Sequence, residues 1–354
     1  EQGRLAHAQL FLGNEGGGNL ALALALVQRI YCTNPSENDA CGECSSCIKN
    51  LKFIHPDVHF SFPTINTNPS KPSCSDDYIS EWRALLGETS YFNETEWLQK
   101  ISSNENKQLK VTAKETQEIL RKLSLKAYEG EAKTLIMWLP EHLRNESNKL
   151  LKIIEEPPQK TYFILVAYNY DSLLPTITSR TQLLKVPTYS PEEIQAFLTA
   201  KYHLEAAHAE NIGFLSDGSI NEAIKLVESV ENNYSDMFRD WMLACFKNDL
   251  YTVSALTEQI AKLGRNQIQI FLKNGLRILR ESLMYSTVPN YEIRFEENAK
   301  NFIMKFSSTL NAHYIERSYE QINDVVYHIM RNANAKISLF NLSLELRKNF
   351  IRKR

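Results

Sequence analysis

The residues most suited to chemistry are four of the six cysteines, which lie within sixteen residues of one another: Cys32, Cys41, Cys44 and Cys47. Cysteines at such short spacing are typical of a tetrahedral zinc site. Nothing in the sequence suggests secretion, so we expect reduced thiols, with an adventitious disulfide as the alternative. Because protein thiolates would fill all four positions, the predicted zinc is structural rather than catalytic. Cys74 and Cys245 are isolated, and we assign them no role.

A glycine-rich turn is the second candidate site. It follows a predicted strand at 8–12, and Gly13 and Gly18 have the spacing of the phosphate-binding pattern G-x4-G-K-[S/T]. Asn19 stands where that pattern has lysine, and Leu20 stands where it has a hydroxyl residue. An amide cannot supply the charge of lysine to the β- and γ-phosphates, and leucine offers no hydroxyl to Mg²⁺. We therefore predict that Gly13, Gly18 and Asn19 form a degenerate phosphate loop without productive ATP binding.

The acidic pair of a P-loop ATPase is also missing. The apolar strand predicted at 134–139 runs into Pro140 and Glu141, so that Glu141 is a single carboxylate behind a proline. ATPases of this class need acidic residues for metal binding and for activation of water. Two independent losses predict that this chain does not hydrolyse ATP.

The elements that must position these residues alternate between strands and helices in the first half of the chain. This order predicts a parallel sheet with crossover helices. Thr112 to Glu115 has the pattern of a capping box at the start of a helix. The predicted strands are at 8–12, 57–62, 134–139, 162–167 and 182–186.

Three domains are predicted along the chain. An α/β domain covers 1–188 and includes residues 63–108, a polar segment with some helix around 82–86 that we interpret as an insertion. After it only helices are predicted, in a small domain over 189–233 and an all-helical domain over 234–354.

The composition excludes some classes of protein. Forty basic and 42 acidic residues give a net charge of −2, which argues against a uniformly basic nucleic-acid coat protein. No apolar run approaches the roughly 18–20 residues that span a bilayer, so no membrane association is expected. There is no signal peptide, and because the sequence begins at Glu1 rather than Met, we expect that the start of the natural chain is missing.

Four further motifs follow in order along the chain: Asn148–Pro158, Thr178–Thr181, Leu215–Ser219 and Asn332–Lys336. They resemble the N-x-L-L-K-x-x-E-E-P-P helix, the Ser-Arg-Cys motif (with Thr181 replacing the cysteine), the glycine-serine turn of the AAA+ lid and a collar-helix signature of bacterial DNA polymerase III clamp-loader subunits. The motor subunits (gamma/tau) carry the lysine and the acidic pair that are absent here, so the resemblance is to the delta-prime type. Residues 63–108 do not match, which suggests a lineage-specific insertion.

The resemblance implies a AAA+ domain with a zinc module at 32–47, a helical lid and a helical collar. It also implies a cytoplasmic ring, at the bacterial replisome on the nucleoid, whose other members are gamma/tau and delta and which places a sliding clamp on primer-template DNA. Arg180, with Ser179 in the same motif, would be an arginine finger that reaches into the ATP site of a neighbour. The chain itself would not be an ATPase, although it would belong to the DNA polymerase III holoenzyme.

Two other functions stay open. One is an active clamp-loader ATPase of gamma/tau type with an unusual phosphate loop, which would bind and turn over ATP alone. The other is a zinc-ribbon nucleic-acid-binding module outside replication, which would bind DNA in a salt-dependent manner; the net charge of −2 argues against it.

Overall fold

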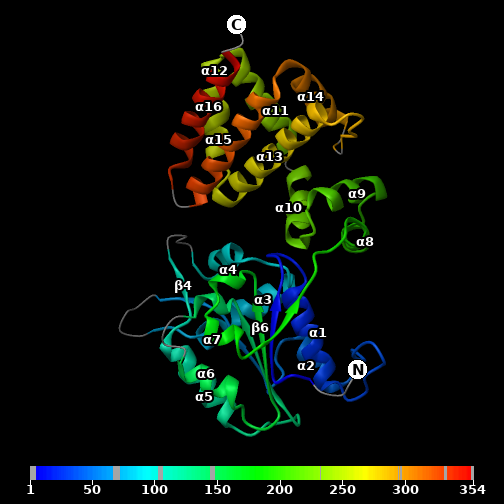
Figure 1. Cartoon of the computed structure of the whole chain (residues 1–354), viewed down its shortest axis with the longest axis vertical. Helices are drawn as coiled ribbons and strands as arrows, with labels where there is room; N and C mark the ends of the chain where they lie inside the picture. Colours follow the sequence, from blue (N-terminus) through cyan, green and yellow to red (C-terminus); the bar gives the residue numbers. More distant parts are fainter. Residues whose placement is uncertain are drawn as a thin grey trace. The chain divides into compact units, whose positions relative to one another are not determined.

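The chain divides into two compact units, Glu1–Tyr189 with Ser219–Asn221 and Ser190–Gly218 with Glu222–Arg354. The computed structural model describes residues 5–66, 72–102, 107–143, 148–231, 233–293, 295, 297–330 and 333–351 (Figure 1). Asn332, which begins the predicted collar motif, lies outside these residues. The second unit contains both the predicted lid and the predicted collar. No helix of the described ranges is long and apolar enough to cross a membrane.

A five-stranded parallel sheet in the order β2-β5-β6-β1-β7 forms the centre of the first unit. The α/β prediction is therefore confirmed, and each of the five predicted strands agrees within one residue at both ends. Apolar side chains pack on both faces of the sheet, so its central strands β5 and β6 are almost entirely buried, as is typical of parallel sheets, whereas the edge strand β7 is exposed. The strands are β1 (Ala8–Leu12), β2 (Val58–Ser61), β5 (Lys133–Trp138), β6 (Thr161–Ala167) and β7 (Gln182–Lys185).

The helices of this unit follow their sequence signals with one exception. The Leu/Ala segment forms α1 because Leu20, Ala23 and Val27 bury one helical face. At the start of α5 the Thr112 side chain accepts a hydrogen bond from the Glu115 N–H, but the reciprocal half of the predicted capping box is absent. The Glu115 carboxylate instead accepts bonds from the backbone N–H and hydroxyl of Ser75. The helices are α1 (Asn19–Tyr31), α2 (Ser45–Leu51), α5 (Ala113–Ser124), α6 (Asn148–Glu155) and α7 (Pro175–Thr178), with short 3-10 turns η2 (Pro140–His142) and η4 (Tyr170–Ser172).

The segment predicted as an insertion is part of the core rather than an appendage. Trp82 of α3 stacks on Phe62 with ring centroids 4.2 Å apart and lies 5.3 Å from Trp138 of the sheet. Trp97 of α4 donates from Nε1 to the Pro63 carbonyl oxygen at 2.8 Å. The segment contains β3 (Thr64–Ile65), η1 (Ser75–Tyr78), α3 (Ile79–Glu88) and α4 (Glu94–Ile101), and β3 pairs antiparallel with β4 (Leu109–Lys110).

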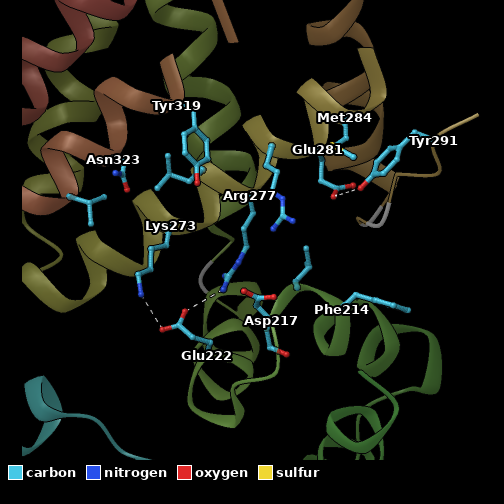
Figure 2. A pocket seen from close by; sticks show the side chains of 15 residues that line it. Phe214, Asp217, Glu222, Lys273, Arg277, Glu281, Met284, Tyr291, Tyr319 and Asn323 are labelled. Atoms are coloured by element: carbon cyan, nitrogen blue, oxygen red, sulfur yellow. Dashed lines mark hydrogen bonds and ion pairs between the residues drawn. The ribbon is translucent and has the colours of Figure 1, made fainter. Parts of the chain in front are cut away.

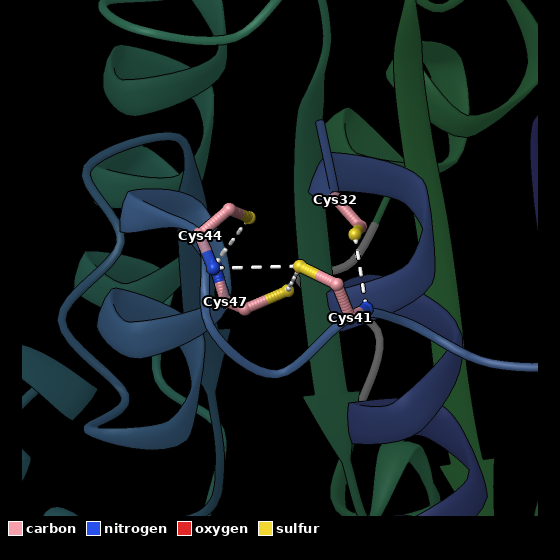
Figure 3. A group of neighbouring side chains, drawn as sticks. All are labelled: Cys32, Cys41, Cys44 and Cys47. Atoms are coloured by element: carbon pink, nitrogen blue, oxygen red, sulfur yellow. Dashed lines mark hydrogen bonds between the residues drawn. The ribbon is translucent and has the colours of Figure 1, made fainter. Parts of the chain in front are cut away.

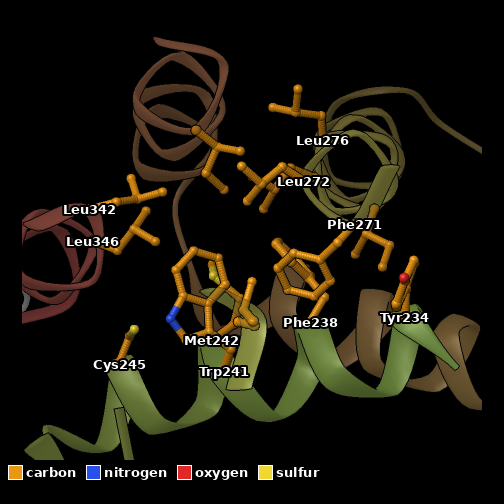
Figure 4. Close-up of a cluster of buried hydrophobic side chains, with 14 of the residues drawn as sticks. Tyr234, Phe238, Trp241, Met242, Cys245, Phe271, Leu272, Leu276, Leu342 and Leu346 are labelled. Atoms are coloured by element: carbon orange, nitrogen blue, oxygen red, sulfur yellow. The ribbon is translucent and has the colours of Figure 1, made fainter. Parts of the chain in front are cut away.

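The described part of the second unit is helical, as predicted. Its largest core surrounds Phe238 and Trp241 of α11 and Phe271 of α13, all essentially unexposed (Figure 4). Trp241 donates from Nε1 to the Ser343 hydroxyl at 2.9 Å, which satisfies the one polar atom of this aromatic cluster. The helices are α8 (Pro191–Tyr202), α9 (Ala206–Leu215), α10 (Ile220–Glu231), α11 (Tyr234–Lys247), α12 (Leu250–Ala261), α13 (Arg265–Thr287), α14 (Glu297–Thr309), α15 (Ala312–Met330) and α16 (Ala335–Ile351).

Candidate functional site

The four clustered cysteines converge between the end of α1 and the start of α2 (Figure 3). Cys32 follows the last residue of α1, Cys44 caps α2, and Cys47 lies in its first turn. All four sulfur atoms lie within 4.8 Å of one another, and those of Cys41 and Cys47 are 3.9 Å apart. Zinc–sulfur bonds of about 2.3 Å in a tetrahedron would separate the sulfurs by about 3.8 Å. The group could therefore hold a metal ion, and its donor set is compatible with zinc.

Backbone N–H groups already point at these sulfurs. Cys41 donates to the sulfur of Cys32 at 3.2 Å, and Cys47 donates to that of Cys44 at 3.4 Å. Hydrogen bonds from Thr33 lower the pKa of the Cys44 thiol to about 5, whereas burial raises the pKa of Cys47 to about 12. A bound divalent cation would lower the pKa of all four thiols, because its positive charge stabilises the negative thiolate.

The glycine-rich turn leaves the carboxyl end of β1, next to the ends of β6 and β7, because Leu12 pairs with both Ala167 and Lys185. This edge is where parallel α/β proteins bind ligands. Gly18 precedes α1 without a side-chain cap, and Gly16 has φ +73°, so the turn has the strand–turn–helix context that the sequence predicted.

The side chain of Asn19 occupies the inside of this turn. Asn19 is 1% exposed and donates from Nδ2 to the Ala167 carbonyl oxygen at 3.2 Å. A methyl group on Gly13 would come within 2.4 Å of Asn19 Oδ1, and one on Gly17 within 3.6 Å. A phosphate loop places its bound anion in this interior, so here the amide of the chain itself fills the space.

The outside of the turn is covered by Tyr189 and by residues 219–221, which belong to the same unit as the turn. The Ser219 hydroxyl donates to the Glu15 carbonyl oxygen, and the Asn221 N–H donates to that of Gly16, each at 3.3 Å. A methyl group on Gly16 would lie 2.5 Å from the Ser219 hydroxyl oxygen. At the helix start, the Tyr189 hydroxyl is close enough that a methyl group on Gly18 would lie 2.8 Å from it.

Glu141, the single carboxylate after β5, is bound to backbone. Its Oε1 accepts hydrogen bonds from the N–H groups of Tyr168 and Asn169 at 2.6 and 2.9 Å. The carboxylate therefore closes the turn after β6. Its second oxygen, Oε2, is buried and accepts no hydrogen bond from the described residues.

Arg180 and Ser179 lie at the surface, at the end of α7. The Arg180 side chain is 31% exposed, and its Nε donates to Oε2 of Glu155 at 3.0 Å. One terminal nitrogen also bonds the Thr176 carbonyl oxygen at 3.1 Å and the Ser179 hydroxyl at 3.3 Å. The guanidinium is thus oriented by three neighbours while part of it faces solvent.

The spacing of the residues correctly predicted the cysteine group, and the turn lies between strand and helix as expected. Sequence reasoning did not identify Glu155 as the partner of Arg180, and it missed Tyr189, Ser219 and Asn221 as residues that cover the turn. No local signal could have found them, because Glu155 and Arg180 are 25 positions apart and Asn221 lies about 200 positions from the turn.

Comparison with known proteins gives consistent matches. Residues 1–190 match the family described as DNA polymerase III, delta subunit. DNA polymerase III subunit delta' of Yersinia pestis is 30% identical over 181 residues, which are 50% of this chain and 41% of that protein. The delta' subunit of Bacillus subtilis is 26% identical over 55% of this chain and 46% of its own length. The chain thus spans less than half of each of these two delta' relatives.

A DNA polymerase III subunit gamma of Buchnera aphidicola is 25% identical over 342 residues, which cover 90% of this chain and 82% of that protein. Among solved structures, a gamma subunit-related protein of Thermotoga maritima covers 99% of this chain and 96% of its own, with 15% identity and a TM-score of 0.42. A score this low does not by itself establish a shared arrangement.

Replacement of Asn19 by aspartate tests the role of its amide. Asn19→Asp places an acceptor where Nδ2 now donates to Ala167, and we expect a loss of about 2 kcal/mol or more in the free energy of unfolding. Because burial favours the neutral acid, the pKa of the introduced carboxyl rises, so the loss is larger at pH 7 than at pH 5. Urea unfolding followed by tryptophan fluorescence measures it.

The matched control is Asn14→Asp, since Asn14 is an exposed residue of the same turn. Equal stability of the two variants at both pH values would contradict the assignment of a buried hydrogen bond to Asn19.

Proposed function

The chain belongs to the DNA polymerase III delta subunit family and is a clamp-loader subunit of delta-prime type; from this premise we propose that it does not hydrolyse ATP and acts on the ATP site of a neighbouring subunit. The observation that carries the proposal is the buried Asn19 amide inside the turn that should receive phosphate. Lysine at this position would supply charge to the β- and γ-phosphates, and the neutral amide of Asn19 does not.

The packing around the turn supports the same conclusion. Tyr189 lies against Gly18, while Ser219 and Asn221 bond the carbonyl oxygens at the apex. A triphosphate would have to displace these contacts and the Asn19 amide together. Glu141 is a single carboxylate whose Oε1 is already bound to two backbone N–H groups, and it has no second acidic residue beside it in the sequence to complete the pair of an ATPase.

We propose that Arg180 is the group that acts on the neighbour. A guanidinium supplied in trans neutralises charge that develops on the γ-phosphate, and its planar donors suit phosphate oxygens better than an ammonium does. Arg180 is suited to this role because it is part-exposed and oriented by Glu155, Thr176 and Ser179. In this proposal Glu155 holds the side chain extended until the phosphate of the neighbour replaces it.

The partners proposed from the family are gamma/tau and delta in the ring, together with the sliding clamp and primer-template DNA through the assembled complex. The specific assignment stays a proposal, because the chain spans only part of its delta' relatives.

We also propose that the metal held by the cysteine group is a structural zinc ion. Its ligands would be Cys32, Cys41, Cys44 and Cys47, whose sulfurs are separated by distances close to those of a tetrahedral thiolate site. The ion would join the end of α1 to the start of α2, because Cys32 directly follows α1, Cys44 and Cys47 lie at the start of α2, and Cys41 lies in the loop between them.

The rival function is an active ATPase of gamma type, which is favoured by the long match to a gamma subunit. The two functions differ in what the isolated chain does. We expect no Mg²⁺-dependent binding of labelled ATP at micromolar concentration and no turnover by the purified chain. Saturable binding together with hydrolysis would favour the rival.

Arg180→Ala in a reconstituted loader tests the action in trans. We expect turnover at the one ATP site that Arg180 faces to fall by about 10³-fold or more. The total DNA-stimulated ATPase rate of the loader should therefore lose the part that this site contributes, and clamp loading should fall as well. Arg180→Lys should recover little, because lysine lacks the planar fork of donors.

The matched control is Arg121→Ala. Arg121 is also an exposed arginine paired with a glutamate, at 2.8 Å from Glu118, but it lies on α5. Assembly should be unchanged in both variants, as judged by gel filtration. Full ATP turnover and clamp loading by the Arg180→Ala loader would refute the proposed role.

For the metal, protein purified without chelator should contain about one zinc per chain, because the four sulfurs complete the coordination. Cys47→Ser should lower the zinc content and the melting temperature, whereas Cys245→Ala, at a buried cysteine of the other unit, should leave the zinc content unchanged. A well-folded chain that takes up no added zinc would show that the site is not a zinc site.

A further inference from the structure

A cavity of about 490 Å³ opens in the second unit, next to the Leu215–Ser219 motif (Figure 2). One wall is α13, the facing wall is α15, and the turn after α9 closes one end. The volume is within the range of about 300–1,000 Å³ that is typical of small-molecule sites. Its lining combines apolar side chains with three cations, three carboxylates and neutral polar groups, so the kind of ligand depends on which charges are already paired.

Three cations follow one face of α13: Lys273, Arg277 and Arg280. The first two already pair with one carboxylate. Glu222 of α10 accepts from Lys273 Nζ and from a terminal nitrogen of Arg277, each at 3.2 Å. Although burial opposes ionisation, these cations hold the pKa of Glu222 below its usual range. Glu222 also pairs with Lys225, and the Asp217 carboxylate acts on Arg277 as well, so the charge of Lys273 and Arg277 is shared with two carboxylates.

Arg280 differs from its two neighbours. Its side chain is exposed and lines the cavity, and within the described residues it makes no ion pair and no hydrogen bond. The adjacent carboxylate, Glu281, is engaged elsewhere, because it accepts a hydrogen bond from the Tyr291 hydroxyl at 2.7 Å. Arg280 is thus a cation whose five donors remain available in a partly enclosed space.

Neutral polar and apolar groups also line the cavity with Arg280. Tyr319 and Asn323 of α15 add a hydroxyl and an amide, while Leu276 and Met284 of α13 add apolar surface. A guanidinium with nearby neutral polar groups matches a single carboxylate or phosphate, which it can bind through two parallel N–H bonds. The apolar side chains match a hydrocarbon or ring body attached to that anionic group.

We propose that this cavity binds a small organic anion, with Arg280 receiving one carboxylate or phosphate group and with the apolar body of the ligand against Leu276 and Met284. Nucleic acid is disfavoured, because further phosphates along a strand would meet the carboxylates of Asp217, Glu222 and Glu281 around the same cavity. The site is independent of the phosphate turn and of Arg180, so its test does not depend on the proposed function.

The experiment uses the full chain with ¹³C-labelled methionine methyl groups, of which there are six. Met284 lines the cavity, and Met242 lines an apolar groove between α11 and α14 that would report nonspecific binding of a ring. Phenyl phosphate, phenylacetate, benzyl alcohol and a short single-stranded oligothymidylate are titrated separately. Loss of its signal in Met284→Leu assigns the Met284 resonance.

We expect phenyl phosphate, phenylacetate or both to shift the Met284 methyl signal saturably at millimolar concentration or below, with Met242 unaffected. The probe that binds more tightly shows whether the site prefers a phosphate or a carboxylate group. Arg280→Gln should weaken this binding by about tenfold or more, because the charge-assisted bonds are lost. Arg317→Gln, at an exposed arginine of α15 outside the cavity, should leave it unchanged.

Three results would overturn the proposal. These are the absence of a saturable shift at Met284 with either anion, an equal response to uncharged benzyl alcohol, and an unchanged affinity in Arg280→Gln. Tighter binding of the oligothymidylate than of both small anions would also overturn it, in favour of a nucleic-acid surface. The unchanged signals of the other methionines show in each case that the variant is folded.

Discussion

The functional interpretation of the first unit depends on one buried hydrogen bond, from the Asn19 amide to the Ala167 carbonyl oxygen. A turn that joins a strand to a helix directs N–H groups toward its own interior, and this interior must be filled by an anion or by protein. Here the side chain at the first position of α1 fills it. The bond also joins α1 to β6, so it stabilises the strand–turn–helix unit without a ligand.

The filled turn explains why we expect Arg180, at the surface, to be the group that acts on ATP, and not the turn at the carboxyl edge of the sheet. The interior of the turn is filled and its apex is bonded by residues 219–221, although an open cavity lined by Gly13, Tyr168 and Lys185 remains at the same edge. Arg180 lies between α7 and β7. Its side chain is partly exposed to solvent, and the Glu155 carboxylate balances its charge. An exposed ion pair is worth little to stability, so its exchange for a stronger phosphate contact would cost the fold little.

The insertion and the second unit show two further uses of buried polar groups. Around Trp82 and Trp97 the aromatic rings of the insertion pack against the sheet, and the Glu115 carboxylate bonds Ser75 to anchor the segment. Around Glu222 one carboxylate is shared by Lys225, Lys273 and Arg277, while Arg280 has no partner among the described residues.

The amino-acid sequence by itself determined whatever depends on neighbours in the chain. Strand positions follow from apolar runs, α1 from its leucines and alanines, and the cysteine group from ligands within sixteen residues, because these signals act over one or two turns. The losses at Asn19 and Leu20 are also visible locally, since chemistry that needs an ammonium or a hydroxyl fails wherever those groups are absent. Only the tertiary structure decided where the Asn19 amide points, that Glu155 holds Arg180, that Glu115 bonds Ser75 across 40 positions, and that α13 and α15 enclose a cavity. Those contacts join residues far apart in the chain, and their partners are selected by packing geometry, which no periodicity or spacing in the sequence encodes.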